Sequence, residues 1–432
     1  MRYTSVVLGL LCCPILASAQ GTRLLRQPTV SNTQIAFAYA GDIWVASRDG
    51  GDAKRLTSFP GTESNPHFSP DGKQIAFSMQ YGGNTDVYVI DAAGGEARRL
   101  TWHPGPDLAR GWSPDAKRIL FSSARVSAPS VGVQQLWTIA ATGGVPERLP
   151  IPDALRGSFS PDGQRLAYEK VSRWDVEWRN YRGGQTHPIT IYTVASQAVD
   201  TLPSQGTLDT WPVWMGDAIY FISDRDWAAN IWKYDIASKQ LTQLTHYKDY
   251  DVKTLDAGSG VIAYEEAGYL HLLEPASGKD AQLAITCRGD LPWAEARWLD
   301  ASKWIESASL SPSGARALFS ARGEVFSVPA EKGDARNLTR SSGTAERTPV
   351  WSPDGKQVAW FSDASGEYRL MIGTQEGLSA PREIKFEQPT FYHTADWSPD
   401  GKYIAVTDEG LNLLLVEVAT AMYFPSGDQS AV

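Results

Sequence analysis

Histidine is the side chain best suited to acid–base chemistry near neutral pH, and the chain carries six: His67, His103, His187, His246, His271 and His393. A nucleophilic serine or cysteine needs such a base beside it, together with a third group that orients the base. None of the six lies in a Gly-x-Ser-x-Gly elbow or another local catalytic signature. His67 and His271 occupy strand positions of a repeat that runs through the chain. We therefore interpret the histidines as structural and predict no catalytic residue.

Patterns of metal ligands are also missing from the sequence. It contains no His-x-x-x-His, Cys-x-x-Cys or EF-hand loop. Two of the three cysteines, Cys12 and Cys13, lie in an N-terminal segment that we expect to be removed, and Cys287 remains alone. A single cysteine cannot form an internal disulfide, so we interpret Cys287 as a small buried apolar residue. We predict no metal and no cofactor.

One long loop, from Ser172 to His187, concentrates side chains that could bind a ligand. Long loops with aromatics and arginines on a rigid scaffold are common recognition sites, and arginine can hold a carboxylate by paired hydrogen bonds. We predict that peptides bind to Arg173, Trp178, Arg179, Tyr181 and Arg182. On the same face we expect a rim made of Arg125, Gln134, Arg225 and Trp227. The alternative is that the aromatic loop packs against the structural repeat that carries it or against another domain.

A repeated sequence motif indicates the scaffold that would position these residues. An aromatic or apolar residue is followed by a turn of the type Ser-Pro-Asp-Gly and then by a short alternating strand, starting at Phe68, Trp112, Phe159, Leu310, Trp351 and Trp397. Serine, proline and glycine in this order are typical of a type I turn. A period of about 40–50 residues with this content is typical of a β-propeller, with one four-stranded blade per repeat. The sequence therefore predicts an all-β fold.

Degenerate copies of the phrase raise the number of turns to nine, near residues 31, 70, 114, 161, 216, 259, 312, 353 and 399. Propellers close with about four to eight blades, so we expect the chain to divide at the irregular stretch Cys287–Trp293. We predict a six-bladed propeller of TolB-like repeats over residues 22–286 and the first blades of a second, incomplete propeller over residues 290–432. The repeat fails beyond Val418, which suggests a fragment or an interrupted gene.

The N-terminus and the charge balance bear on location and partners. Arg2, the apolar run Val6–Leu16 and the motif Ala17-Ser18-Ala19 together predict a signal peptide over residues 1–19, cleaved after Ala19, and hence a periplasmic protein. No other stretch is long and apolar enough to span a bilayer. The net charge is −9 with no basic run, which argues against nucleic-acid binding.

Several segments make the mature chain resemble the N-terminal part of bacterial tricorn-type serine proteases. These are the loop Trp178–Thr186, the junction Arg288–Trp293 and the run Ala317–Asp334. The resemblance implies a six-bladed propeller followed by a seven-bladed one. It also implies that the serine, the histidine and the oxyanion machinery of the family lie in a later region. Peptides or unfolded segments are the implied partners, and the full-length protein would be a homo-oligomer.

Three functions follow as alternatives. The first is a non-catalytic propeller region that gates or recognises peptides for an exported tricorn-like peptidase. The second is a TolB-like periplasmic binding propeller with no enzyme attached. The third is a dipeptidyl-peptidase-type propeller separated from its hydrolase domain. Because a propeller scaffold does not by itself specify a function, the repeats do not decide among them.

Overall fold

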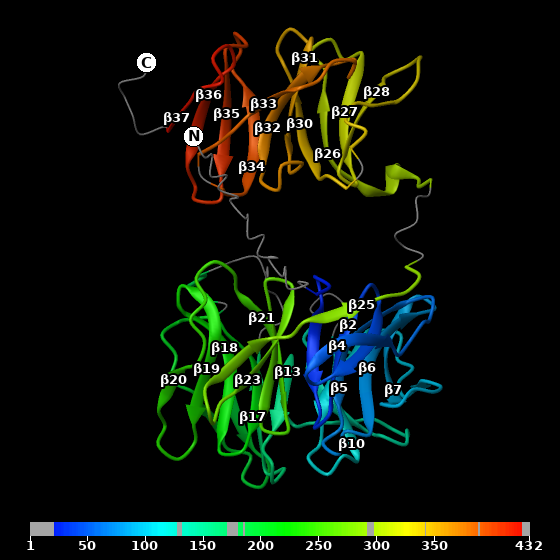
Figure 1. Cartoon of the computed structure of the whole chain (residues 1–432), viewed down its shortest axis with the longest axis vertical. Helices are drawn as coiled ribbons and strands as arrows, with labels where there is room; N and C mark the ends of the chain where they lie inside the picture. Colours follow the sequence, from blue (N-terminus) through cyan, green and yellow to red (C-terminus); the bar gives the residue numbers. More distant parts are fainter. Residues whose placement is uncertain are drawn as a thin grey trace, which may run out of the picture. The chain divides into compact units, whose positions relative to one another are not determined.

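A computed structural model describes residues 21–127, 132–170, 180–184, 186–291, 298–341, 343–387 and 389–425. The signal peptide predicted over residues 1–19 lies outside these ranges. The described residues form strands almost throughout, with one short 3-10 helix, η2 (Ala301–Trp304). This confirms the all-β prediction. The chain divides into two compact units, residues 1–295 and 296–432, whose elements are labelled in Figure 1.

Six sheets make up the described part of the first unit, and their first four strands pair antiparallel. The first sheet contains β1 (Arg26–Val30), β2 (Gln34–Tyr39), β3 (Asp42–Ser47) and β4 (Gly50–Arg55). The second contains β5 (Thr62–Phe68), β6 (Gln74–Tyr81), β7 (Asn84–Asp91) and β8 (Arg98–Arg99). The third contains β9 (Asp107–Trp112), β10 (Arg118–Ser123), β11 (Gln135–Ala140) and β12 (Glu147–Arg148).

The remaining sheets of this unit repeat the same strand order. The fourth contains β13 (Arg156–Phe159), β14 (Arg165–Glu169), β15 (Thr190–Thr193) and β16 (Val199–Thr201). The fifth contains β17 (Asp209–Met215), β18 (Ala218–Asp226), β19 (Ala228–Asp235) and β20 (Leu241–Gln243). The sixth contains β21 (Val252–Gly258), β22 (Val261–Glu266), β23 (Tyr269–Glu274) and β24 (Lys279–Gln282). A last short strand, β25 (Ile285–Cys287), pairs in parallel with β4.

The Ser-Pro-Asp-Gly turn joins the first strand of a sheet to the second, as predicted. In the second sheet the Ser69 hydroxyl donates to Asp71 Oδ1 at 2.6 Å and accepts from the backbone N–H of Gln74 at 3.0 Å. Gly72 has a φ of 70°, a left-handed conformation that glycine adopts at little cost. The motif recurs because each copy supplies hydrogen-bond partners to the same backbone groups at the turn between the first and second strands.

A second recurring set of contacts joins the third strand of a sheet to the residues that follow its fourth strand. In the second sheet the Thr101 hydroxyl donates to Asp86 and accepts from the N–H of Val87, while Arg99 pairs with the other oxygen of Asp86 at 2.6 Å. Similar contacts join Asn230 to Thr245 in the fifth sheet. In the second sheet, Arg99-Leu100-Thr101 therefore supplies the two donors that the buried carboxylate of Asp86 needs.

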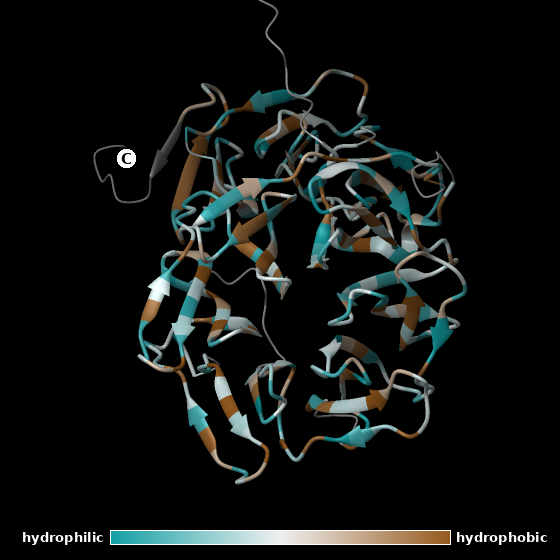
Figure 2. Ribbon diagram, turned by 60° about the horizontal axis from the view of Figure 1, so that its bottom comes forward, coloured by the Kyte–Doolittle hydropathy of each residue, from teal (hydrophilic) through white to brown (hydrophobic). Residues whose placement is uncertain are grey.

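The hydrophobic core of the first unit lies between neighbouring sheets. Six apolar clusters each join two successive sheets, and one of them unites Ile35 and Phe37 of the first sheet with Val261 and Leu270 of the sixth. The first strands contact one another in the order β1, β5, β9, β13, β17, β21 and back to β1. Figure 2 shows these sheets arranged around a common centre. The first unit is therefore a closed ring of sheets.

Three further four-stranded sheets form the described part of the second unit. The first contains β26 (Ile305–Leu310), β27 (Arg316–Ala321), β28 (Glu324–Pro329) and β29 (Arg336–Asn337). The next contains β30 (Glu346–Trp351), β31 (Gln357–Ser362), β32 (Arg369–Thr374) and β33 (Arg382–Ile384). The last contains β34 (Tyr392–Trp397), β35 (Tyr403–Asp408), β36 (Leu413–Glu417) and β37 (Tyr423–Pro425). Two apolar clusters join these sheets in sequence order.

Candidate functional site

A cavity of about 430 Å³ lies at the centre of the first unit. Its walls come from the ends of the six first strands and from the turns that follow them, so every sheet of the ring contributes. Aromatic, proline and charged side chains share the lining: Trp112, Trp211, Trp214, Pro114, Arg110 and Arg156 are among them. A concave site with apolar walls and a few polar groups is what a small ligand or a peptide end requires. We call this cavity the axial pocket.

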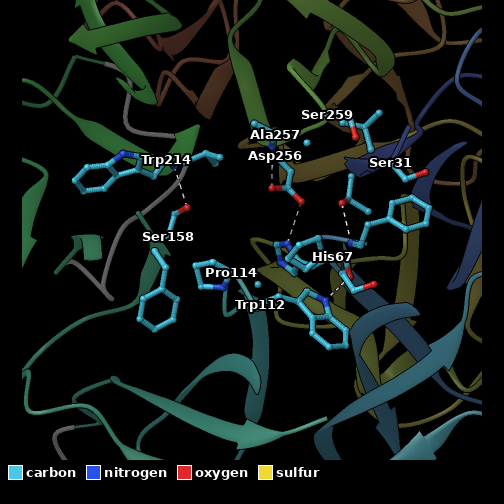
Figure 3. A pocket seen from close by; sticks show the side chains of 18 of the residues that line it. Ser31, His67, Trp112, Pro114, Ser158, Trp214, Asp256, Ala257 and Ser259 are labelled. Carbon is cyan, nitrogen blue, oxygen red and sulfur yellow. Dashed lines mark hydrogen bonds and ion pairs between the residues drawn. The ribbon is translucent and has the colours of Figure 1, made fainter. Parts of the chain in front are cut away.

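A histidine and an aspartate from distant parts of the chain meet in the axial pocket. His67 Nδ1 lies 3.2 Å from Asp256 Oδ2, and Figure 3 shows the two side chains pointing toward each other. They occupy equivalent positions in β5 and β21. His67 directly precedes Phe68, which pairs with Ile75, and Asp256 directly precedes Ala257, which pairs with Ile262. This pairing orients the imidazole, as a carboxylate does for a catalytic or ligand-binding histidine. No serine hydroxyl is within hydrogen-bond distance of His67 among the described residues.

Contacts made by three tryptophans hold parts of the wall of the axial pocket in place. Trp112 Nε1 donates to the carbonyl oxygen of His67 at 2.8 Å, and the backbone N–H of Trp214 donates to Ser158 Oγ at 2.9 Å (Figure 3). The guanidinium of Arg156 lies 4.1 Å from the ring centre of Trp211, a cation–π contact. Such contacts fix the wall before any ligand binds, which lowers the cost of binding.

Two arginines in the wall differ in how their charge is compensated. Arg156 pairs with Glu169 at 2.5 Å, and the other oxygen of Glu169 accepts from the backbone N–H of Trp211 at 2.7 Å. Arg110 is only 8% exposed and donates from Nε to Ser122 Oγ at 3.0 Å, with Nη1 3.5 Å from Asn65 Oδ1. Burial, and then the like charge of Arg156, holds the pKa of Arg110 well below its usual range. Within the described ranges no carboxylate lies within 4.0 Å of Arg110.

The inner strands carry strained residues beside the axial pocket. Gln27, Asn65 and Trp211 are left-handed, with φ between 51° and 54°, and each lies where the pairing of its strand shifts register. Residues other than glycine adopt this conformation at a cost, and bulges of this kind redirect side chains near functional sites. Gln27 and Asn65 use the bulge to bond each other, because Asn65 N–H donates to Gln27 Oε1 at 2.8 Å.

Comparison with known proteins places this ring of sheets in a family. A model of the tricorn protease N-terminal β-propeller domain matches residues 22–279. The chain belongs to this family. It is 27% identical to tricorn protease homolog 1 of Streptomyces coelicolor, over 82% of this chain and 34% of that protein. It is 24% identical to the tricorn protease of Thermoplasma volcanium, over 92% of this chain and 38% of that protein. The family resemblance predicted from the sequence is thereby confirmed.

A solved structure agrees with this assignment at the level of the fold. The crystal structure of the tricorn protease superposes with a TM-score of 0.59 and 22% identity, covering 93% of this chain and 39% of that one. The match of the family model to residues 22–279 makes the first unit a tricorn-type β-propeller domain. The chain spans about a third of the length of these two curated relatives.

Only part of the peptide-binding loop predicted for this tricorn-family chain can be placed. Arg173, Trp178 and Arg179 lie outside the described residues. Arg182 pairs with the buried Asp224 of β18 at 2.8 Å and also donates to its carbonyl oxygen at 3.0 Å. Tyr181 accepts a hydrogen bond from Arg182 through its carbonyl oxygen. The cation of Arg182 therefore already has a partner within the domain, and its role in peptide binding stays a prediction.

The predicted rim residues are also engaged internally. Arg125 pairs with the fully buried Asp107 at 2.7 Å, and Arg225 pairs with the fully buried Asp209 at 2.7 Å. Trp227, by contrast, is 68% exposed. Gln134 accepts a backbone hydrogen bond from Ala154 through its carbonyl oxygen.

The rim lies at the opposite strand ends from the axial pocket. Asp107, the partner of Arg125, begins β9, whereas the pocket residue Trp112 ends it. The residues that sequence reasoning missed are Arg110, Trp211 and Asp256. The available signal was that Arg110 stands where the other inner strands have small or apolar residues.

The described residues contain no group of three or more histidine, cysteine or acidic side chains able to hold a metal ion. No helix in the part of the chain that the structure describes has the length and hydropathy needed to cross a membrane.

Proposed function

We propose that this chain is a peptide-handling, non-catalytic propeller region of a tricorn-like serine peptidase. The observation that carries the proposal is the axial pocket, a cavity of about 430 Å³ whose lining includes Trp211, Arg110 and Arg156, at the centre of a tricorn-type propeller domain. Its size suits a short segment of extended peptide rather than a folded protein. Peptides would bind or pass here, and the serine chemistry would belong to another region of the intact protein.

Finer features of the architecture belong to this proposal. We take the six sheets of the first unit as six blades and the three sheets of the second unit as the first blades of a second propeller of the seven-bladed type. Exposed apolar side chains on the outer sheets of the second unit support this reading: Leu310 of β26 is 75% exposed and Leu413 of β36 is 42% exposed. Within the first unit a neighbouring sheet covers such positions.

Export is the second part of the proposal. The motif Ala17-Ser18-Ala19 supports cleavage before Gln20 and a periplasmic location. N-terminal sequencing of material from the periplasmic fraction should begin at Gln20. An intact Met1 on cytoplasmic protein would overturn the export proposal and leave peptide handling untouched.

Binding and turnover of a short labelled peptide test the main proposal. The purified chain should bind the peptide in fluorescence polarisation without cleaving it. Thr33 lines the mouth of the axial pocket and is exposed, so Thr33→Trp should narrow the mouth and weaken binding about tenfold or more. Lys117→Trp, at an exposed turn position outside the lining, is the matched control. Equal binding by both variants, or cleavage by the chain alone, would count against peptide handling in this pocket.

A further inference from the structure

Arg110 stands out because, among the described residues, no carboxylate lies within 4.0 Å of its guanidinium, and the charge of Glu169, which pairs with Arg156, acts on it only from beyond that distance. Its side chain is more than nine-tenths buried and lines the axial pocket, yet its hydrogen-bond acceptors are the neutral oxygens of Ser122 and Asn65. Buried charges in proteins are normally paired, because removing an ion from water without a counter-charge costs several kcal/mol. Arg156, in the same wall, follows the normal rule through Glu169.

The repeat gives no structural reason for an arginine at this position. In each sheet, one residue near the end of the first strand pairs with an isoleucine or leucine near the start of the second strand. In the third sheet this residue is Trp112, which pairs with Ile119, and Arg110 lies two residues before it. At the equivalent place the other five sheets have three buried prolines, a glycine and a leucine: Pro28, Pro66, Pro212, Gly157 and Leu255. Small or apolar residues thus serve the fold at this position. A buried arginine is a costly exception, and such exceptions are expected at functional sites.

We propose that Arg110 is the anchor of a carboxylate-binding subsite in the axial pocket, taking the terminal carboxylate of a peptide or of a small organic acid. The inference rests on the proposed peptide-handling function and names the group that the pocket recognises. Arg156 with Glu169 shows, within the same wall, how a carboxylate pairs with a guanidinium here. A ligand with a single negative charge is favoured over a phosphate dianion, because Asp256 places another negative charge in the lining.

One tryptophan of the lining indicates what accompanies the carboxylate. Trp112 and Trp214 are buried in the apolar clusters between the sheets, whereas Trp211 is only partly buried. An apolar or aromatic C-terminal side chain would bury its surface against Trp211. The inferred ligand is therefore a free α-carboxylate next to an apolar side chain. An amidated terminus lacks the charge that Arg110 would pair with.

Three probes test the subsite: N-acetyl-Ala-Ala-Phe with a free carboxylate, the same peptide amidated, and 3-phenylpropionate. Isothermal titration calorimetry of the unmodified chain should show about tenfold or more preference for the free carboxylate over the amide, the range expected of charge-assisted hydrogen bonds. Arg110→Gln should bind the two peptides equally. Arg110→Lys keeps the charge and should retain part of the preference. The matched control is Arg118→Gln, because Arg118 lies in the same sheet outside the pocket lining.

The outcomes separate this inference from the function on which it rests. Equal binding of both peptides to the unmodified chain, or an undiminished preference in Arg110→Gln, would overturn the carboxylate subsite and leave peptide handling standing. No binding of any probe would overturn both. If Arg110→Gln does not fold, competition decides: 3-phenylpropionate should displace the free peptide from the unmodified chain, and 3-phenylpropanamide should not. Binding of 3-phenylpropionate as tight as that of the peptide identifies a small acid as the ligand, and much weaker binding identifies a peptide end.

Discussion

A buried pair of carboxyl groups at the contact between the first two sheets should make the propeller less stable as the pH rises. Glu63 of β5 is 1% exposed and faces Asp42 of β3, which pairs with Arg55 at 2.7 Å. The Thr57 hydroxyl donates to Glu63 Oε2 at 3.0 Å, and Glu63 Oε1 and Asp42 Oδ1 have no other donor. One proton shared between these two oxygens satisfies both.

The size of the effect follows from the pKa of Glu63. Burial, together with the nearby charge of Asp42, raises this pKa from an ordinary value of 4.5 to about 8. A carboxyl whose pKa is higher in the folded state holds a proton that the unfolded chain releases. Its stabilising contribution is complete below about pH 4.5 and is lost as the pH rises to about 8. At 1.36 kcal/mol per pH unit, the loss across this window is roughly 5 kcal/mol.

Glu63→Gln should remove most of this pH dependence. The glutamine amide can donate to Asp42 and its oxygen can accept from Thr57, so it reproduces the protonated carboxyl at every pH. Urea unfolding between pH 5 and pH 9 should show the variant gaining stability relative to the unmodified chain, by roughly 4 kcal/mol over the range, because part of the effect lies below pH 5. Glu147→Gln, at an exposed position, is the control. A difference between Glu63→Gln and the unmodified chain that stays constant with pH would refute the shared proton.

Three further predictions concern buried or paired groups elsewhere in the first unit. Asp209→Ala leaves Arg225 buried without its counter-charge, so it should lower the free energy of unfolding by about 3–5 kcal/mol in denaturation experiments. Burial raises the pKa of the Cys287 thiol to about 12; iodoacetamide at pH 8 should therefore leave it unmodified in the native chain and label it in urea, as judged by mass spectrometry. Arg182→Ala should cost about 1–2 kcal/mol, because the buried Asp224 loses its cation. An unchanged melting temperature with weaker peptide binding would instead support the recognition role predicted for this loop.

The repeating parts of the fold were predictable because each repeat solves one local problem with the same residues. Ser69, Asp71 and Gly72 satisfy a strand corner among themselves, and Asp86 with Thr101 satisfies the start of a third strand. Contacts of this kind span few residues, so their signature survives as a short phrase. The all-β class followed directly from these phrases.

The axial pocket could not be predicted in the same way, because its neighbours are set by closure of the ring. His67 and Asp256 are 189 residues apart, and they meet only because both occupy the same position in inner strands that converge on the centre. The environment of Arg110 likewise combines its own strand with Asn65 and Arg156 from the two neighbouring sheets. The sequence shows the position of each residue within its repeat. It does not show which charged side chains from the six repeats lie close together at the centre of the ring.

The arginines show most clearly why the residue content of the loops did not identify the arginine that lacks an ion-pair partner. Arg125, Arg182 and Arg225 were marked because they lie in or beside loops, yet each pairs with a buried aspartate of the domain. Arg110 was not marked, because it lies in a strand. A guanidinium already held by a carboxylate has little left to offer a ligand, whereas an unpaired buried one gains most from binding an anion. The property that distinguishes a binding arginine from a structural one is therefore its pairing, which depends on tertiary structure.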